Sequence, residues 1–237
     1  MIFKKNNYLG MKTLIKLLLL ISIALLSYFC IMSIRIPIEF TKTKEAREVR
    51  VIQNLIDIRS AELEFKDQKG GFTDNFDELI EFLKTAKFKS ILKEGALTDL
   101  QLEAGLTEEK AVKIVSSGKQ KDIISNGLEN FRRDTTYIDM IESLYGETYT
   151  HKTIDKLAYI PYSEKEKFTL KVNNAYFNAN GIQIALFEAS APYKTYLHDL
   201  DRQEVLNIID FQMKLEKFPG LQVGDVDSPN NNAGNWE

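Results

Sequence analysis

The chain offers few residues that could do catalytic chemistry. Acidic side chains act as general acids or bases when they lie within hydrogen-bond reach of a reacting group, commonly in pairs. Asp77, Glu78 and Glu188 are the candidate acids, but no spacing in the sequence pairs them. Glu188 alternates with hydrophobic residues, so it is expected on the solvent face of a strand.

The histidines and the cysteine also fail to form a recognisable site. His151 and His198 lie far apart in sequence, outside any metal-ligand motif, and are expected to be surface or hydrogen-bonded residues. The single cysteine, Cys30, lies in an apolar segment, which excludes a disulfide within the chain and a cysteine metal cluster. The sequence therefore predicts a protein that is not an enzyme, with no catalytic and no cofactor-binding residue.

The apolar segment of residues 17–34 limits the function more than any other feature. It carries no charge over 18 residues. As a helix it would span roughly 27 Å, close to the ~30 Å hydrocarbon core of a bilayer. A cleaved signal peptide would have a shorter apolar core and a small-residue exit, and a lipoprotein would have small residues before its cysteine, where Tyr28 and Phe29 stand. An uncleaved membrane anchor fits best.

The orientation of this anchor is less strongly encoded. Basic residues occur on both sides of the span, so the positive-inside rule nearly cancels. Those before it are Lys4, Lys5, Lys12 and Lys16, and those after it are Arg35, Lys42, Lys44, Arg47 and Arg50. The short N-terminal tail favours an inner-membrane, single-pass protein whose C-terminal domain is periplasmic.

Composition limits the partners of that domain. The 237 residues carry a net charge of -3, and nucleic-acid binding usually needs a basic face. We expect membrane contact, other membrane-anchored envelope proteins as partners, and no nucleic acid. Copies of the chain itself, in a homo-oligomer or fibre, are a further expected partner.

Periodicity and turn signals predict an α+β fold with a small antiparallel sheet and inserted helices. An amphipathic stem helix is expected to bury Ile52, Leu55, Ile56 and Leu63, widened by Val51, Ile58 and Phe65, and to end at Gly70-Gly71. Asn75 and Glu78 form a capping-box-like start for the next helix. The expected segments are a cytoplasmic tail (1–16), a transmembrane helix (17–36), the stem (37–72), a helical region with an insertion (73–156), and strands with a C-terminal helix and loop (157–237).

The insertion and the C-terminal region are predicted in more detail. Residues 86–146 read as helical, with helices after Thr107, over 121–131 and over 137–145, and with Arg132-Arg133-Asp134 as an ion pair or a solvated turn. Three strands are expected over 157–162, 168–172 and 182–189, with a tight turn at Asn180-Gly181. A last helix over 203–216 is expected to turn Val205, Ile208, Ile209 and Met213 inward, followed by a polar tail.

The order of these segments resembles type IV pilins and, more closely, the pseudopilins of type II secretion. The run Phe65-Lys66-Asp67-Gln68-Lys69-Gly70-Gly71-Phe72 is similar to the family's motif after its stem helix, and Gly234-Asn235-Trp236-Glu237 is similar to its C-terminal loop. Gly10 stands where the family's processing site would be. The family's glutamate five residues later is replaced by Ile15, which leaves processing and subunit register open.

The resemblance also implies calcium binding in the C-terminal loop. Asp225, Asp227 and Asn231 would supply oxygen ligands of the kind that calcium prefers. Asp and Asn also form turns by hydrogen bonding to the nearby backbone, so a plain turn is the alternative. We further expect residues 221–236 to fold back on the domain, with Trp236 packed in a groove.

Two functions remain open at this point. The first is a non-enzymatic structural protein of the cell envelope, a pseudopilin-like subunit of a secretion or pilus-type assembly. The second is a single-span anchored subunit of another envelope complex. An anchored hydrolase is the third and least favoured.

Overall fold

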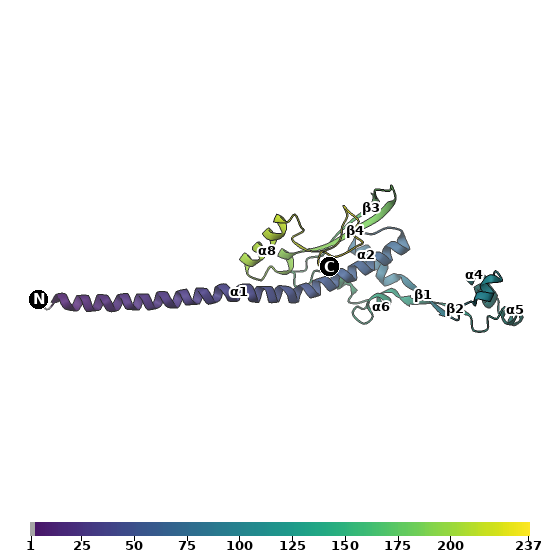
Figure 1. Cartoon of the computed structure of the whole chain (residues 1–237), viewed down its shortest axis with the longest axis horizontal. Coiled ribbons are helices and arrows are strands. Elements are labelled where there is room, and N and C mark those ends of the chain that lie inside the picture. Colours follow the sequence, from purple (N-terminus) through teal and green to yellow (C-terminus); the bar gives the residue numbers. More distant parts are fainter. Residues whose placement is uncertain (1–2) are drawn as a thin grey trace. The chain divides into compact units, whose positions relative to one another are not determined.

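A computed structural model shows a mixed helical and sheet fold with a long apolar N-terminal helix and two small antiparallel sheets (Figure 1). It describes the backbone of residues 3–237. Side chains are described for residues 13–88, 94–133 and 136–237. The predicted α+β class is therefore confirmed.

The chain divides into two compact units. The first comprises residues 1–76 and 156–237, and the second residues 77–155. The head is defined here as the part of the first unit beyond the apolar section, residues 40–76 and 156–237.

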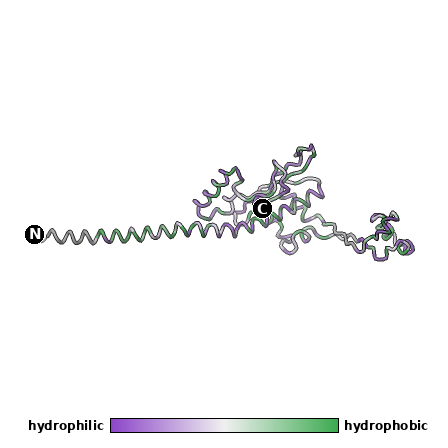
Figure 2. Tube along the Cα trace, in the orientation of Figure 1, coloured by the Kyte–Doolittle hydropathy of each residue, from purple (hydrophilic) through white to green (hydrophobic). Residues whose placement is uncertain are grey.

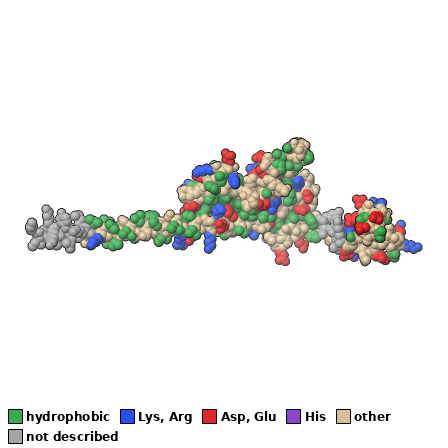
Figure 3. Space-filling model, viewed as in Figure 1, with side chains coloured by type: hydrophobic (Ala, Val, Ile, Leu, Met, Phe, Trp, Pro, Cys, Tyr) green, Lys and Arg blue, Asp and Glu red, His purple; other side chains and the backbone are tan. Residues whose placement is uncertain are grey.

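Helix α1 (Phe3–Lys69) joins the predicted anchor and stem without a break. It runs through Pro37, although proline removes one backbone hydrogen bond from a helix. It ends where Gly70 adopts a φ of 88°, as predicted. Its apolar section is long and hydrophobic enough to cross a membrane, and none of that section is buried in the protein (Figures 2 and 3).

The second half of α1 forms one wall of the hydrophobic core. Its most buried apolar side chains are Val51, Leu55, Ile58, Ala61 and Phe65. The residues predicted to widen the stripe, Val51, Ile58 and Phe65, are buried together with Leu55, whereas the other three residues predicted at its centre are not. Ile52 and Ile56 are half-buried and Leu63 is 39% exposed.

Polar residues on the buried face explain that error. Asn54, Asp57 and Glu62 are buried along the same face as Leu55. The real face is rotated by roughly one residue, or about 100°, from the predicted stripe. The sequence prediction considered only apolar residues, so it did not include the polar residues of the buried face of α1. The carboxylate of Glu62 accepts a hydrogen bond from the Thr73 backbone N–H at 3.2 Å, so it ties the turn after α1 to the helix.

The main sheet has the order β3-β4-β5, with all neighbours antiparallel. Its strands are β3 (Thr169–Phe177), β4 (Gln183–Pro192) and β5 (Gly220–Gly224). The hairpin between β3 and β4 turns at Asn180-Gly181 as predicted, with Gly181 at φ 72°. α1 packs against β4 and β5.

The first of the three predicted strands, over 157–162, was assigned wrongly from the sequence. Residues 157–162 do not form a strand, because the 3-10 helix Ile154–Ala158 occupies their start and only a single bridge joins Tyr159 to Lys167. β5 comes instead from the tail that was expected to be a loop. It follows the break at Pro219, and its short alternation Leu221, Gln222, Val223 is too brief to be read as a strand.

Two helices complete the first unit. They are α7 (Tyr193–Tyr196) and α8 (Arg202–Lys214), the latter close to the predicted 203–216. Asp201 caps α8 by accepting from the N–H groups of Gln203 and Glu204. Val205 is buried and Ile208 and Ile209 are half-buried, but the prediction for Met213 was wrong because it is 61% exposed.

Helix α2 (Phe76–Thr85) belongs to the second unit except for Phe76, and it begins directly after Asn75 as the capping signal predicted. Its apolar residues Phe76, Leu79, Ile80 and Leu83 are all buried.

The second unit is less helical than predicted. β1 (Lys87–Glu94) pairs with β2 (Arg132–Asp139) as a two-stranded ribbon. Besides α2 it holds four short helices, α3 (Asp99–Glu103), α4 (Glu108–Ser116), α5 (Gln120–Ser125) and α6 (Met140–Tyr145). Ala111, Leu128 and Phe131 form a small core among α3–α5.

Three local predictions meet different outcomes here. Thr107 caps α4 as expected, by accepting from the Lys110 N–H. The helix predicted over 121–131 ends at Ser125, before a turn in which Gly127 has a φ of 63°. The helix predicted over 137–145 begins only at Met140, because the chain from Arg132 to Asp139 is strand. Arg133 lies on that strand and pairs with Glu108 at 2.8 Å, whereas the side chain of Asp134 lies outside the described residues.

Candidate functional site

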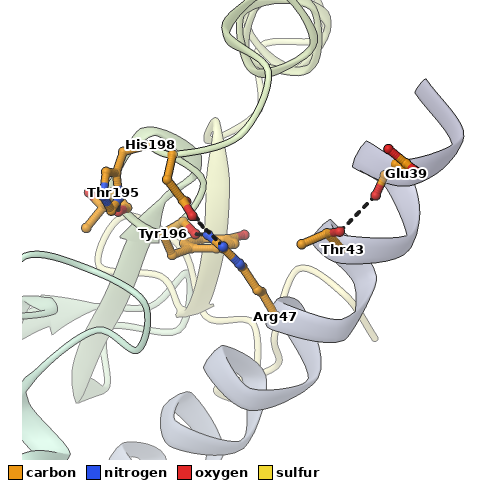
Figure 4. A network of polar contacts seen from close by, with 7 residues as sticks. Glu39, Thr43, Arg47, Thr195, Tyr196 and His198 are labelled. Carbon is orange, nitrogen blue, oxygen red and sulfur yellow. Dashed lines mark hydrogen bonds and ion pairs between the residues drawn. The ribbon is translucent and has the colours of Figure 1, made fainter. Parts of the chain in front are cut away.

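The densest group of long-range polar contacts in the head joins α1 to the segment around α7. Arg47 donates from Nη1 and Nη2 to the two carboxylate oxygens of Asp199, at 2.5 and 2.7 Å. Its Nη1 also donates to the Tyr196 carbonyl oxygen at 2.7 Å (Figure 4). This bidentate geometry is the strong form of an arginine–carboxylate pair. It lowers the pKa of Asp199 to about 2 and raises that of Arg47.

A second polar group lies one residue further along α1. Glu48 accepts from Lys44 Nζ at 2.9 Å and from the Tyr196 hydroxyl at 3.4 Å. Burial, followed by the nearby Glu48 charge, raises the pKa of Tyr193 to about 12 and also raises that of Tyr196. Both tyrosines therefore stay protonated at neutral pH, which suits them as hydrogen-bond donors and not as bases.

We name these six residues the α1–α7 junction: Lys44, Arg47, Glu48, Tyr193, Tyr196 and Asp199. Its charged groups pair with one another, so the junction has a structural role, which is to hold α7 against α1. Thr195 and His198 lie beside it, with His198 Nδ1 3.0 Å from the Thr195 carbonyl oxygen (Figure 4).

A hollow of about 520 Å³ opens next to the junction. It lies between α1, the turn before β5 and the C-terminal residues. Its wall combines aromatic rings with amide and charged side chains. The lining residues include Lys44, Glu48, Tyr193, Gln212, Asp225 and Trp236.

The ion pair of the junction predicts a pH effect on stability. Asp199→Asn should lower the melting temperature of the protein at neutral pH, because Arg47 loses its charged partner. A carboxylate whose pKa is depressed on folding stabilises the folded state above its ordinary pKa of ~3.9 and loses that contribution as pH falls toward 2. The difference in melting temperature between wild type and variant should thus be full above pH ~5, mostly lost by pH ~2 and gone near pH ~1. A difference that stays constant over this range would contradict the pairing.

The C-terminal residues return to the head, as predicted. The Gly224 N–H donates to Ala233 O at 3.0 Å and the Asn235 N–H to Gln222 O at 2.9 Å. Glu237 pairs with Arg59 at 2.8 Å. Trp236 is half-buried with its indole ring over Gly234, where an added Cβ would lie 2.4 Å from the ring.

The predicted calcium ligands lie in and after a tight turn. Asp225 accepts from the N–H groups of Asp227 and Ser228 and from the Ser228 hydroxyl. Asn231 follows at φ 60°. No group of three or more Asp, Glu, His or Cys with metal-binding geometry occurs within the described residues. The donors around Asp225 fit the turn alternative, and calcium binding stays a prediction. Melting with calcium and with chelator separates the two, since a bound ion raises the melting temperature.

The remaining candidate residues do not converge on one site. Glu188 was expected on a solvent face, but it is 6% exposed and accepts from Lys171 Nζ at 2.9 Å, so that prediction was wrong. Its partner sits directly opposite on β3, which the sequence cannot show. Asp77 is exposed on α2. His151 Nε2 lies 2.9 Å from Asp139 Oδ2, so both histidines are hydrogen-bonded as predicted.

Comparisons with known proteins add no relative. No family model, no curated protein and no solved structure matches the chain.

Proposed function

We propose that the protein is a non-enzymatic structural protein of the cell envelope, a pseudopilin-like subunit of a secretion or pilus-type assembly. One observation carries the proposal. A single unbroken helix is apolar and unburied over residues 17–34 and forms part of the core of a small α+β head from Phe40 onward. A subunit of this kind needs no active site.

Physical chemistry connects this layout to assembly. Exposed apolar side chains along the first half of α1 are stable in a bilayer and unfavourable in water. They can leave the bilayer only for another apolar environment, such as a bundle of the same helices. Other membrane-anchored envelope proteins and copies of this chain are the partners that such a helix suits.

We place the head on the periplasmic side of an inner membrane. Basic residues on the two sides of the span nearly cancel in the positive-inside rule, so this orientation follows from the proposed envelope role of the head. Protease added to intact spheroplasts should digest the head without prior lysis of the cells. Full protection of the head until lysis would contradict the placement.

A second candidate is a single-span subunit of another envelope complex. Ile15 favours it, because the resemblance leads one to expect a glutamate at that position. Gly10, the candidate processing residue, lies in α1 but outside the residues whose side chains are described.

Cross-linking within the span tests the first candidate against the second. Cys30 is exposed on α1 and is the only cysteine, so single cysteines can be moved across one helical turn in a Cys30→Ser background. Mild oxidation of membranes holding Leu26→Cys, Ser27→Cys, Tyr28→Cys or Phe29→Cys, which point in four directions about 100° apart around the helix, should give homodimers at the positions facing a neighbouring copy. Homodimers at no position would reject self-assembly through α1, and cross-links to a different protein would favour the second candidate.

A further inference from the structure

The hollow beside the α1–α7 junction is large enough for a small ligand. Its volume is about 520 Å³, and ligand pockets in proteins commonly enclose ~300–1,000 Å³. It is lined by Lys44 and Glu48 from α1, Tyr193 from α7, Gln212 from α8 and Trp236 near the C-terminus. Side chains from four segments that are far apart in sequence therefore surround one space.

The C-terminal wall of the hollow is held in place by the protein itself. Asn235 donates from Nδ2 to the Gly220 carbonyl oxygen at 2.9 Å, and its Oδ1 accepts from the Gln222 N–H at 3.1 Å. The Asn235 N–H donates in turn to Gln222 O at 2.9 Å. Glu237 pairs with Arg59 of α1 at 2.8 Å. The hollow is thus formed before any ligand enters, which lowers the entropy cost of binding.

The hydroxyl of Tyr193 is the observation that points to a ligand. Tyr193 is only 7% exposed and lines the hollow. Within the described part of the chain its hydroxyl has no hydrogen-bond partner, and the oxygen is not sealed from solvent. Hydroxyls of largely buried tyrosines usually find a partner. This one is therefore free to bond to a molecule in the hollow.

The charges around the hollow favour a neutral ligand. Lys44 and Glu48 form an ion pair at 2.9 Å. Lys217 and Asp225 add one charge of each sign to the lining. An ion that entered would lose water and meet a balanced set of charges, and burial of a charge without a matching partner is costly.

The uncharged groups favour a ligand with many hydroxyls. The amide of Gln212 is half-buried and, like the Tyr193 hydroxyl, has no partner in the described chain. A wholly apolar ligand would leave both groups unpaired. An extended peptide would pair along a sheet edge, but the edge of β5 is already paired with the C-terminal residues. A sugar has hydroxyls that donate and accept, and its C–H face packs well on an aromatic ring such as Trp236.

We infer that the hollow binds one neutral sugar unit of a saccharide, whose hydroxyls bond to Tyr193 and Gln212 and whose apolar face packs on Trp236. All residues of this site belong to the head. The inference is therefore independent of membrane anchoring and of assembly.

Titration of the full chain with saccharides tests it. Trp236 is the only tryptophan, so its emission reports on this hollow. The protein is kept in a detergent without a sugar headgroup, and triacetylchitotriose and maltotriose are added in separate titrations. The two probes distinguish an N-acetylated amino sugar from a simple hexose. At least one should change the emission in a saturable way. No saturable change with either sugar at millimolar concentration would overturn the inference.

Two variants separate the site from an indirect effect. Tyr193→Phe removes only a hydroxyl without a protein partner, so the melting temperature should not change. Its affinity for the sugar should fall about tenfold, because one hydrogen bond to the ligand is lost. Gln203→Ala is the matched control, since the Gln203 amide donates to Asn207 on the same helix and does not line the hollow.

Unchanged affinity in the Tyr193 variant, or an equal loss in the Gln203 variant, would contradict the site. A blocked neutral tripeptide is titrated in parallel. A stronger response to the peptide than to either sugar would assign the hollow to a peptide and would also overturn the inference.

Discussion

Replacing Leu55 with aspartate is expected to unfold the head. Leu55 has no exposed surface and lies at the centre of the buried face of α1. Truncating such a leucine alone costs about 2–5 kcal/mol, and an unpaired carboxylate in the core adds to that. Since whole domains are stable by only about 5–15 kcal/mol, little folded head should remain. The emission of Trp236, the only tryptophan, reports the loss in detergent-solubilised full-length protein.

Leu63→Asp is the matched control. Leu63 lies on the same helix two turns further on but is 39% exposed, so a carboxylate there stays in contact with water. Its melting temperature should fall far less than that of the Leu55 variant. Equal losses for the two variants would show that the buried face of α1 has been placed wrongly.

A methyl group added at Gly224 is expected to separate β5 from β4. A Cβ at this position would lie 2.1 Å from the Phe187 carbonyl oxygen, which belongs to the neighbouring strand and cannot turn aside. Gly224 also has a φ of 73°, which costs a non-glycine residue roughly 1–2 kcal/mol by itself. Gly224→Ala should therefore destabilise the head by clearly more than that strain.

Gly181→Ala isolates the steric part of this effect. Gly181 has nearly the same φ, 72°, but nothing lies within 4 Å of an added Cβ. Chemical denaturation should show a loss near the conformational strain for Gly181→Ala and a much larger loss for Gly224→Ala. Similar losses would mean that the strands can move apart at little cost.

The predictable parts of the fold are those with strong local signals. The end of α1 at Gly70-Gly71, the start of α2 after Asn75 and the turn at Asn180-Gly181 depend on residues adjacent in sequence. β1 and β2 were missed because their charged sequences resemble those of a helix. Their pairing joins residues far apart in sequence, such as Lys87 with Asp139 and Glu94 with Arg132. β5 was missed for a similar reason, since its partner is β4.

The α1–α7 junction could not be predicted either, because its contacts also join residues far apart in sequence. Arg47 and Asp199 are 152 residues apart, and each stands among other charged residues that look equivalent in the sequence. Nothing local distinguishes Arg47 from Arg50. The burial of Glu188 was predicted wrongly for a related reason. The alternation of residues along a strand shows which side chains share a face, but it does not show which face the rest of the chain covers.

The continuity of α1 has a mechanical consequence. No loop separates the section of α1 suited to the bilayer from the section packed against β4 and β5. The head therefore has no flexible link to its anchor. A helix that advances by one residue moves ~1.5 Å and turns by ~100°. Any force that lifts or rotates the apolar section is therefore delivered directly to the core, and the head must travel and turn with it as one piece.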